Sequence, residues 1–285
     1  MINNRFNKDK IEFSCEVFPP KRDDDIYGIY KTIDEICELN PDFISVTYGA
    51  GGSNSKKTAQ ISSYIENVAE ISSLAHMTAV GMTPEKLDDM LSQLNKKNVK
   101  RILCLRGDKP RMMTDKEFDN RYYKHASDLI KDVKKHNIFK IAAACYPECH
   151  PESKNDNDDL MYLKQKCECG VDELITQMFF DNEKFYRFRE KAEKLGIDNP
   201  VHAGIMPITN AKMLGTSVSL SGSSVPHELT DIIAKYSEIP EDMCKAGIEY
   251  AVRQIEDLMK NGIYGIHLYS MNKSIVTKEI YDMIR

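Results

Sequence analysis

Phe13-Ser-Cys-Glu-Val-Phe-Pro-Pro-Lys21 is a short apolar run that ends in two prolines and a lysine. A doubly wound parallel sheet usually follows its first strand with a Gly-x-Gly-x-x-Gly turn that holds a dinucleotide phosphate. Pro19, Pro20 and Lys21 stand at that place instead. The glycine-rich run Tyr48-Gly-Ala-Gly-Gly-Ser53 fits neither this fingerprint nor a P-loop. The first strand and its turn therefore disfavour the doubly wound fold.

Eight such apolar runs recur along the chain and predict strands at Glu12–Phe18, Phe43–Thr47, His76–Val80, Arg101–Leu105, Lys140–Cys145, Leu174–Met178, Val201–Ile205 and Gly265–Tyr269. The segments between them have helical period, with apolar faces such as Ile26, Ile29, Tyr30, Ile33 and Cys37, or Cys244, Ile248, Val252, Ile255 and Met259. Strands that are apolar on both faces and alternate with helices indicate a parallel sheet covered by helices. We therefore predict an α/β fold, a TIM (β/α)8 barrel, as a single domain over residues 1–285. The least regular stretch, Thr209–Pro226, is predicted to be an extended loop with a serine-rich turn.

Composition excludes several classes of protein. The 285 residues are 41% hydrophobic and 29% charged, with a net charge of -5, so no overall positive field is available to hold nucleic acid. The mean hydropathy is -0.47 and no apolar run approaches the length of a bilayer span. The N-terminus lacks the apolar segment of a secretory signal. We expect a cytoplasmic protein that binds neither membrane nor nucleic acid.

The eight cysteines do not have the spacing of a disulfide scaffold, and we expect reduced, buried thiols. A group in the middle of the chain could suggest a metal ion: Cys145, Cys149, His150, Cys167 and Cys169. Neither a Cys-x-x-Cys pair nor a His-x-x-x-His pair is present, and small buried cysteines are common in protein cores. We therefore predict no metal site.

Polar residues on or near the predicted strand ends form the candidate site, because a barrel of this kind builds its active site there. Glu16 is the most informative, since its apolar neighbours would desolvate the carboxyl group, raise its pKa and suit it to general acid chemistry. The alternative is an ion pair with an arginine such as Arg106. Gly107 and Asp108 follow Arg106 directly and could approach a ligand, or could form an ordinary helix-capping turn.

Three further residues also have two readings. His76 could contact a ligand or be a packed core histidine, whereas His150, in a loop with two prolines, favours a positioned role. Gln177 could bind a heterocycle through its amide donor and acceptor, or satisfy buried backbone groups. The acidic runs Asp23–Asp25 and Asp156–Asp159 are predicted to be solvated helix starts.

A family resemblance accounts for most of this polar set. The chain resembles methylenetetrahydrofolate reductase in the order and spacing of Phe-Ser-Cys-Glu-Val-Phe-Pro-Pro-Lys, Phe-Ile-Ser-Val-Thr-Tyr-Gly-Ala-Gly-Gly-Ser, Leu-Arg-Gly-Asp, Tyr-Pro-Glu-Cys-His-Pro-Glu, Ile-Thr-Gln-Met-Phe-Phe-Asp and Gly-Ile-Met-Pro-Ile-Thr-Asn. The resemblance runs from about residue 10 to the C-terminus. It implies a barrel that binds FAD and reduces 5,10-methylenetetrahydrofolate to 5-methyltetrahydrofolate, with NADH or NADPH as the usual donor, in one-carbon metabolism and methionine biosynthesis.

The resemblance also implies residue roles. Glu16 would protonate N10 of the folate and Asp108 would stabilise the resulting 5-iminium cation, while Gln177 would hold the pterin and Tyr269 and Lys273 would bind substrate. The implied FAD contacts are Thr47, His76, Arg106, Gly107, Ala126, Ala144, Tyr146, His150, Asp159, Lys166 and Ile175. Relatives of this kind usually form homo-oligomers.

Three departures from the family pattern leave alternatives open. Ala211 stands where bacterial members commonly have a phenylalanine that packs on nicotinamide or folate, so a partner protein could supply the electrons in place of NAD(P)H. His125 replaces a common tyrosine, and Lys273 replaces an arginine that could grip the folate glutamate tail. A non-catalytic subunit that binds flavin or folate is a further alternative, against which the presence of Glu16, Asp108 and Gln177 argues.

Overall fold

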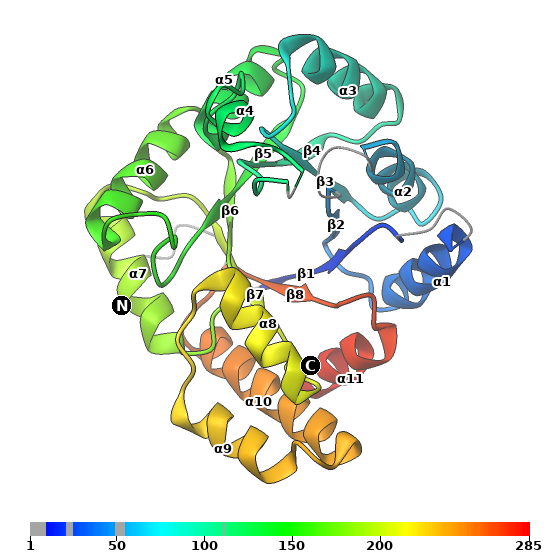
Figure 1. Cartoon of the computed structure of the whole chain (residues 1–285). Coiled ribbons are helices and arrows are strands. Elements are labelled where there is room, and N and C mark those ends of the chain that lie inside the picture. Colours follow the sequence, from blue (N-terminus) through cyan, green and yellow to red (C-terminus); the bar gives the residue numbers. More distant parts are fainter. Residues whose placement is uncertain (1–9, 21–24, 49–54, 111) are drawn as a thin grey trace. The chain divides into compact units, whose positions relative to one another are not determined.

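A computed structural model describes residues 10–20, 25–48, 55–110 and 112–285 of the chain. Its eight strands are parallel neighbours in sequence order, β1 to β8, and close into a barrel (Figure 1). The strands are β1 (Glu12–Val17), β2 (Phe43–Val46), β3 (Ser73–Thr78), β4 (Arg101–Leu105), β5 (Lys140–Cys145), β6 (Glu173–Thr176), β7 (Val201–Ile205) and β8 (Gly265–Tyr269). The predicted TIM-barrel fold is therefore confirmed.

Helices follow every strand. They are α1 (Ile26–Cys37), α2 (Ser55–Asn67), α3 (Pro84–Lys96), α4 (Asp115–Asp119), α5 (Ala126–Lys135), α6 (Asp156–Glu168), α7 (Asn182–Lys194), α8 (Ala211–Ser221), α9 (His227–Tyr236), α10 (Pro240–Lys260) and α11 (Ser274–Ile284). The predicted apolar faces are the buried ones, as Ile29 and Ile33 of α1 and Ile248 and Ile255 of α10 illustrate.

The third strand begins earlier than predicted. The prediction placed it at 76–80, whereas β3 starts at Ser73, which is fully buried. The Ser73 backbone N–H and hydroxyl both donate to the Glu66 carboxylate, at 2.8 and 3.0 Å, so a polar residue can open a buried strand. Beyond Thr78, the backbone N–H of Ala79 donates to the carbonyl of Leu105, the last residue of β4, at 2.9 Å, and that of Val80 donates to the Arg106 carbonyl at 3.0 Å.

The predicted loop over 209–226 is wrong, because its middle is the helix α8. The Asn210 side chain caps the helix by accepting from the Met213 backbone N–H at 3.1 Å. Gly222 ends it in the left-handed conformation, with φ 71°. The many serines and the glycine at position 215 hid the helix, whereas burial of Met213, Leu214 and Val218 against a core cluster stabilises it. That cluster consists of Met178, Phe180, Met206, Ile208, Leu229 and Met243.

The chain divides into two compact units, which are described separately below. The N-terminal unit comprises residues 14–144 and 165–174, and the C-terminal unit comprises residues 1–13, 145–164 and 175–285. The predicted single domain over residues 1–285 stays a prediction.

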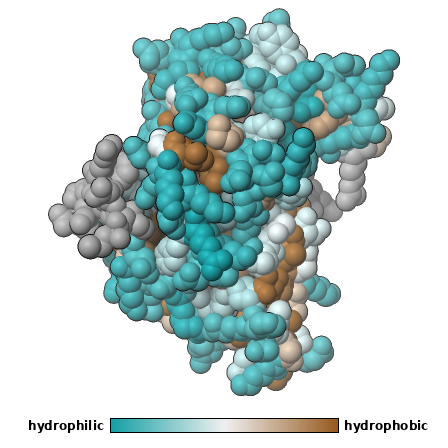
Figure 2. Space-filling model, turned by 90° about the vertical axis from the view of Figure 1, so that its left-hand side faces the viewer, coloured by the Kyte–Doolittle hydropathy of each residue, from teal (hydrophilic) through white to brown (hydrophobic). Residues whose placement is uncertain are grey.

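One face of the molecule is predominantly polar. Figure 2 shows a face that is mostly hydrophilic, with its hydrophobic side chains in small separate areas. Among the described residues, no helix is long and apolar enough to cross a bilayer.

A buried ionic cluster lies where three strands of the N-terminal unit begin. Glu173, the first residue of β6, has no exposed side-chain surface, and its two oxygens lie 2.7 Å from Arg101 Nη2 and 2.7 Å from Lys140 Nζ. Arg101 and Lys140 are the first residues of β4 and β5. The Arg101 guanidinium also stacks 4.0 Å from the centre of the Phe43 ring. A carboxylate buried this deeply depends on both cations.

We expect Glu173→Gln to lower the free energy of unfolding by about 3 kcal/mol, because the buried Arg101 would lose its counter-charge. Urea unfolding followed by circular dichroism measures the change. The control is Glu190→Gln, which breaks an exposed pair with Lys194 and should have little effect. An equal loss in both variants would contradict the assignment.

Candidate active site

Glu16 and His76 form the central contact of the N-terminal unit. Glu16 lies near the carboxyl end of β1, and His76 lies in β3. Glu16 Oε2 is 3.6 Å from His76 Nε2, which is just beyond hydrogen-bond distance. The Glu16 side chain is 21% exposed and that of His76 is 6% exposed. The structure thus places a partly exposed carboxyl group beside a buried imidazole.

Burial shifts both groups toward their neutral forms. Desolvation raises the pKa of Glu16 from 4.5 to about 8 and lowers the pKa of His76 from 6.5 to about 3. The two groups are therefore both uncharged near neutral pH and do not form an ion pair there. The predicted desolvation of Glu16 is confirmed. His76 is buried as the core reading expected, but within the described residues its Nε2 has no hydrogen-bond partner.

Arg106, Gly107 and Asp108 follow β4 directly. The Arg106 guanidinium lies 5.9 Å from the centre of the Phe118 ring, and its Nε donates to the Gly107 carbonyl at 3.3 Å. Gly107 has a φ of 80°, and a Cβ there would come within 2.9 Å of the Thr78 Cβ, so only glycine fits this turn. Asp108 is exposed. The helix-capping reading is wrong, since the next helix, α4, is capped by Thr114.

The remaining predicted residues of the N-terminal unit lie on β2, β5, α5 and α6. Thr47 follows β2, and its backbone N–H donates to the Val17 carbonyl at 3.0 Å. Lys166 of α6 donates from Nζ to the Ala144 carbonyl at 2.5 Å, which holds the lysine against β5. Ala126 is the first residue of α5, and His125, one of the departures from the family pattern, is the exposed residue before it.

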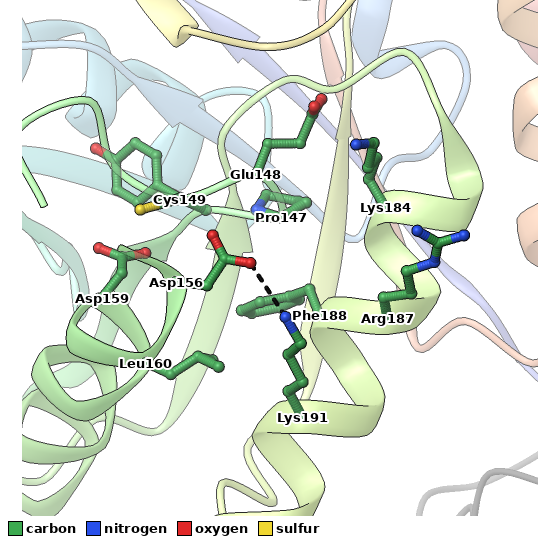
Figure 3. Close-up of a pocket in the computed structure, with 11 residues that line it drawn as sticks. Pro147, Glu148, Cys149, Asp156, Asp159, Leu160, Lys184, Arg187, Phe188 and Lys191 are labelled. Carbon is green, nitrogen blue, oxygen red and sulfur yellow. Dashed lines mark hydrogen bonds and ion pairs between the residues drawn. The ribbon is translucent and has the colours of Figure 1, made fainter. Parts of the chain in front are cut away.

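A pocket of about 200 Å³ lies in the C-terminal unit, between the segment after β5, the start of α6 and one face of α7 (Figure 3). Two predicted residues line it, Tyr146 and Asp159. The Tyr146 ring packs edge-on against His150, with ring centres 4.7 Å apart. The Asp159 carboxylate accepts a hydrogen bond from the Ser153 hydroxyl at 2.8 Å. Asp156, Asp158 and Asp159 form the first turn of α6, as the acidic run predicted.

Sequence reasoning missed the basic wall of this pocket. Lys184, Arg187 and Lys191 of α7 line it, opposite Asp156 and Asp159 of α6 (Figure 3). Lys191 Nζ is paired with Asp156 at 3.1 Å. The spacing i, i+3, i+7 places the three side chains on one helical face and could have revealed the group. The pocket therefore has acidic residues on one side and basic residues on the other.

Gln177 and Tyr269 close strands of the C-terminal unit. The Gln177 backbone N–H donates to the Cys145 carbonyl at 2.7 Å, and its side-chain oxygen accepts from the Met178 backbone N–H at 3.0 Å. The Tyr269 hydroxyl donates to the Thr176 carbonyl at 2.7 Å. Ile175 is buried in β6, with an exposed fraction of 3%. The amide nitrogen of Gln177 thus stays available to a ligand, while its oxygen is already used.

Lys273 lies at the start of α11 and reaches another loop. Its Nζ donates to the Thr209 hydroxyl at 2.9 Å, which ties the segment after β8 to the segment after β7. Thr209 was not among the predicted site residues, and no sequence motif indicated this contact. Ala211 is the first residue of α8, two positions further on.

All eight cysteines are free thiols, but only Cys15, Cys104 and Cys145 are buried. The prediction of buried thiols is therefore wrong for the other five, because these lie on helices and loops that are partly open to solvent. Within the part of the chain that the structure describes, no three His, Cys, Asp or Glu side chains converge on a metal position.

The arrangement supplies a proton donor at neutral pH, amide and hydroxyl groups for a heterocycle, and cations for an anionic ligand. A protonated, desolvated carboxyl group is a general acid poised near the working pH of most enzymes. The N-terminal unit contributes the cations Arg106 and Lys166, and the C-terminal unit by itself contributes the basic side chains of α7. The N-terminal unit by itself therefore suits a reaction that needs a proton near neutral pH.

The sequence model of the methylenetetrahydrofolate reductase family matches residues 1–285. A 5,10-methylenetetrahydrofolate reductase from Buchnera aphidicola is 33% identical over 275 residues, which cover 96% of this chain and 92% of that protein. The reductase from Pectobacterium carotovorum is 31% identical over 265 residues, 93% of this chain and 87% of that protein. The plant methylenetetrahydrofolate reductase (NADH) 1 of Arabidopsis thaliana is 31% identical, and the chain spans 46% of its length.

A solved structure shares the fold. An uncharacterized protein from Clostridium thermocellum, which binds two copies of 5-methyl-5,6,7,8-tetrahydrofolic acid, has a TM-score of 0.67. It is 14% identical, and the match covers 97% of this chain and 95% of that chain. At this identity the likeness concerns the fold alone.

The raised pKa of Glu16 gives a testable dependence of stability on pH. Between pH 4.5 and about 8 the folded chain keeps a proton that the unfolded chain has lost. The wild-type free energy of unfolding therefore falls as pH rises through this window, by at most about 1.4 kcal/mol per pH unit. Glu16→Gln cannot ionise, so its stability relative to wild type should rise across the window and level off above it. Urea unfolding at several pH values measures this difference.

The control for this titration is Glu190→Gln, whose carboxylate is exposed on α7 and paired with Lys194. This variant should show no such rise with pH. A constant difference between Glu16→Gln and wild type would mean that Glu16 ionises normally.

Proposed function

Because the chain belongs to the methylenetetrahydrofolate reductase family, we propose that it reduces 5,10-methylenetetrahydrofolate to 5-methyltetrahydrofolate with FAD and NADH or NADPH. The observation that carries the proposal is the buried carboxyl group of Glu16, which burial keeps protonated near neutral pH. Opening the five-membered ring of the substrate requires such a proton donor. The whole chain would act as one catalytic domain. The homo-oligomer follows from the family resemblance, and the cytoplasmic location follows from the low hydropathy of the chain.

Glu16 would give its proton to N10 of the folate. The O–H bond of the carboxyl group breaks, an N–H bond forms at N10, and the ring opens to a 5-iminium cation. Asp108, exposed after β4, would place a negative charge beside this cation and stabilise it. Gln177 would hold the pterin through its amide nitrogen, and Tyr269 would position the substrate from the end of β8.

The residues present fit a flavin dinucleotide. Arg106 and Lys166 offer cations for its diphosphate, together with His150, and Asp159 offers a carboxylate for a ribose hydroxyl. His76, buried in β3, would contact FAD from the same unit. The other residues that would contact FAD are Thr47, Gly107, Ala126, Ala144, Tyr146 and Ile175. FAD would supply the hydride chemistry that no side chain provides.

The substrate tail would meet Lys273. Its ammonium group, held by the Thr209 hydroxyl, is a point charge that suits one carboxylate of the folate glutamate.

A second source of electrons is favoured by one feature, the small residue at the start of α8. Ala211 offers no aromatic surface on which a nicotinamide ring could stack. The alternative is a catalytic subunit that takes its electrons from a partner protein.

We expect Glu16→Gln to keep its flavin but to reduce methylenetetrahydrofolate about 10²- to 10⁴-fold more slowly, since the amide cannot donate the required proton. The measurement is reoxidation of the reduced protein by the folate in anaerobic stopped flow. Glu12→Gln, at the opposite end of the same strand, is the matched control and should reoxidise at the wild-type rate. Wild-type reoxidation by Glu16→Gln would overturn the role of this residue.

An anaerobic titration of the purified protein with NADH or NADPH tests the donor. We expect the flavin absorbance to bleach and then to recover when methylenetetrahydrofolate is added. A flavin that only a chemical reductant bleaches would favour the partner protein. A purified protein that neither contains nor binds flavin would refute the proposed cofactor.

A further inference from the structure

The side chains of His76 and Glu16 point toward each other but stop just short of a hydrogen bond. Nε2 of His76 lies 3.6 Å from Glu16 Oε2, and a shift of a few tenths of an ångström would bring the two atoms to hydrogen-bond distance. His76 is 5% exposed, so its ring cannot turn to water for a partner. A buried ring nitrogen without a partner carries a desolvation cost that a bond to Glu16 would remove.

We propose that His76 is the positioning residue of Glu16, with a neutral imidazole whose Nε2–H donates to Glu16 Oε2. This inference rests on the proposed function, in which Glu16 is the proton donor. With Oε2 accepting from His76, the acidic proton of Glu16 is held on Oε1, where the substrate can take it. His76 thereby determines which oxygen of the carboxyl group carries the transferable proton.

The opposite tautomer would work against the reaction. If Nε2 lacked a proton, it would accept the Glu16 proton and withhold it from N10. The Nε2–H form also acts after the proton has left, because it donates to the carboxylate that remains in a nearly dry site. A donor that stabilises this product state lowers the barrier to proton transfer.

His76 is a titratable group that the described part of the N-terminal unit places 3.6 Å from Glu16. The strand between them, β2, contributes Ser45, which is the register partner of Glu16 and carries no charge. Desolvation is the cause of the raised pKa of Glu16. A change at position 76 should therefore be visible in the titration of Glu16.

The test compares His76→Leu with His76→Gln in the purified flavoprotein. Glutamine places an amide N–H near the position of Nε2, whereas leucine removes the donor and keeps an apolar side chain. Infrared difference spectra against Glu16→Gln isolate the protonated carboxyl band of Glu16 and give its pKa. We expect His76→Leu to raise this pKa by about one to two units and to lower kcat about 10- to 100-fold, with KM changed less. His76→Gln should restore most of the pKa and part of kcat.

His136→Leu is the matched control, because this histidine of the same unit is partly exposed and lies against Asp88. It should leave the Glu16 band unchanged. An unchanged pKa in His76→Leu would overturn the positioning role, and so would loss of bound flavin without a change in that pKa. Failure of the proposed function gives a different result from failure of this inference. If the proposed function is wrong, Glu16→Gln reduces the folate at the wild-type rate, independently of the result for His76→Leu.

Discussion

Burial of both faces of each strand is the constraint on which the structure depends. A closed parallel barrel covers both faces of its strands, so apolar side chains fill most strand positions and a polar side chain within the barrel loses water. The cost of this desolvation differs with the residue. Ser14 and Ser45 need one hydrogen bond each, whereas a carboxylate needs a counter-charge or a proton.

The N-terminal unit contains both solutions for a buried carboxyl group. Glu173 is held between Arg101 and Lys140 at 2.7 Å, an arrangement that suits an ionised group. Glu16 has a neutral histidine at 3.6 Å, and its pKa is raised to about 8, so it is held as the acid. Glu173 is fully buried between two cations, whereas the side chain of Glu16 is 21% exposed and lies beside a neutral histidine. This difference separates a structural charge from a proton donor.

The sequence predicted the barrel because eight mainly apolar runs alternate with segments of helical period. This pattern extends over the whole chain and can be recognised without knowledge of tertiary contacts. Sequence patterns failed where distant contacts decide the outcome. Ser73 opens β3 because Glu66 accepts its hydrogen bonds, and α8 forms because Met213, Leu214 and Val218 meet a methionine-rich cluster. Neither partner lies within the local sequence that a propensity argument uses.

The candidate site was predictable to a similar degree. The desolvation of Glu16 followed from its apolar neighbours on the same strand, but its contact with His76 did not, because that contact depends on the register of two further strands. The basic face of α7 could have been read from its spacing. The bond between Lys273 and Thr209 joins residues 64 positions apart and left no trace in the sequence.

Charged residues at the starts of the strands stabilise the fold, whereas polar residues at the strand ends belong to the proposed active site. Glu12, Arg101, Lys140 and Glu173 are the first residues of their strands, and each is paired within its own unit. Glu16, Arg106, Asp108 and Gln177 lie at or just after the strand ends, where the chain leaves the barrel. A substitution among the first group should change the free energy of unfolding, because it breaks pairs that no ligand replaces. A substitution in the second group should mainly change ligand binding or proton transfer, since these side chains carry polar groups at the end of the barrel where a ligand would bind.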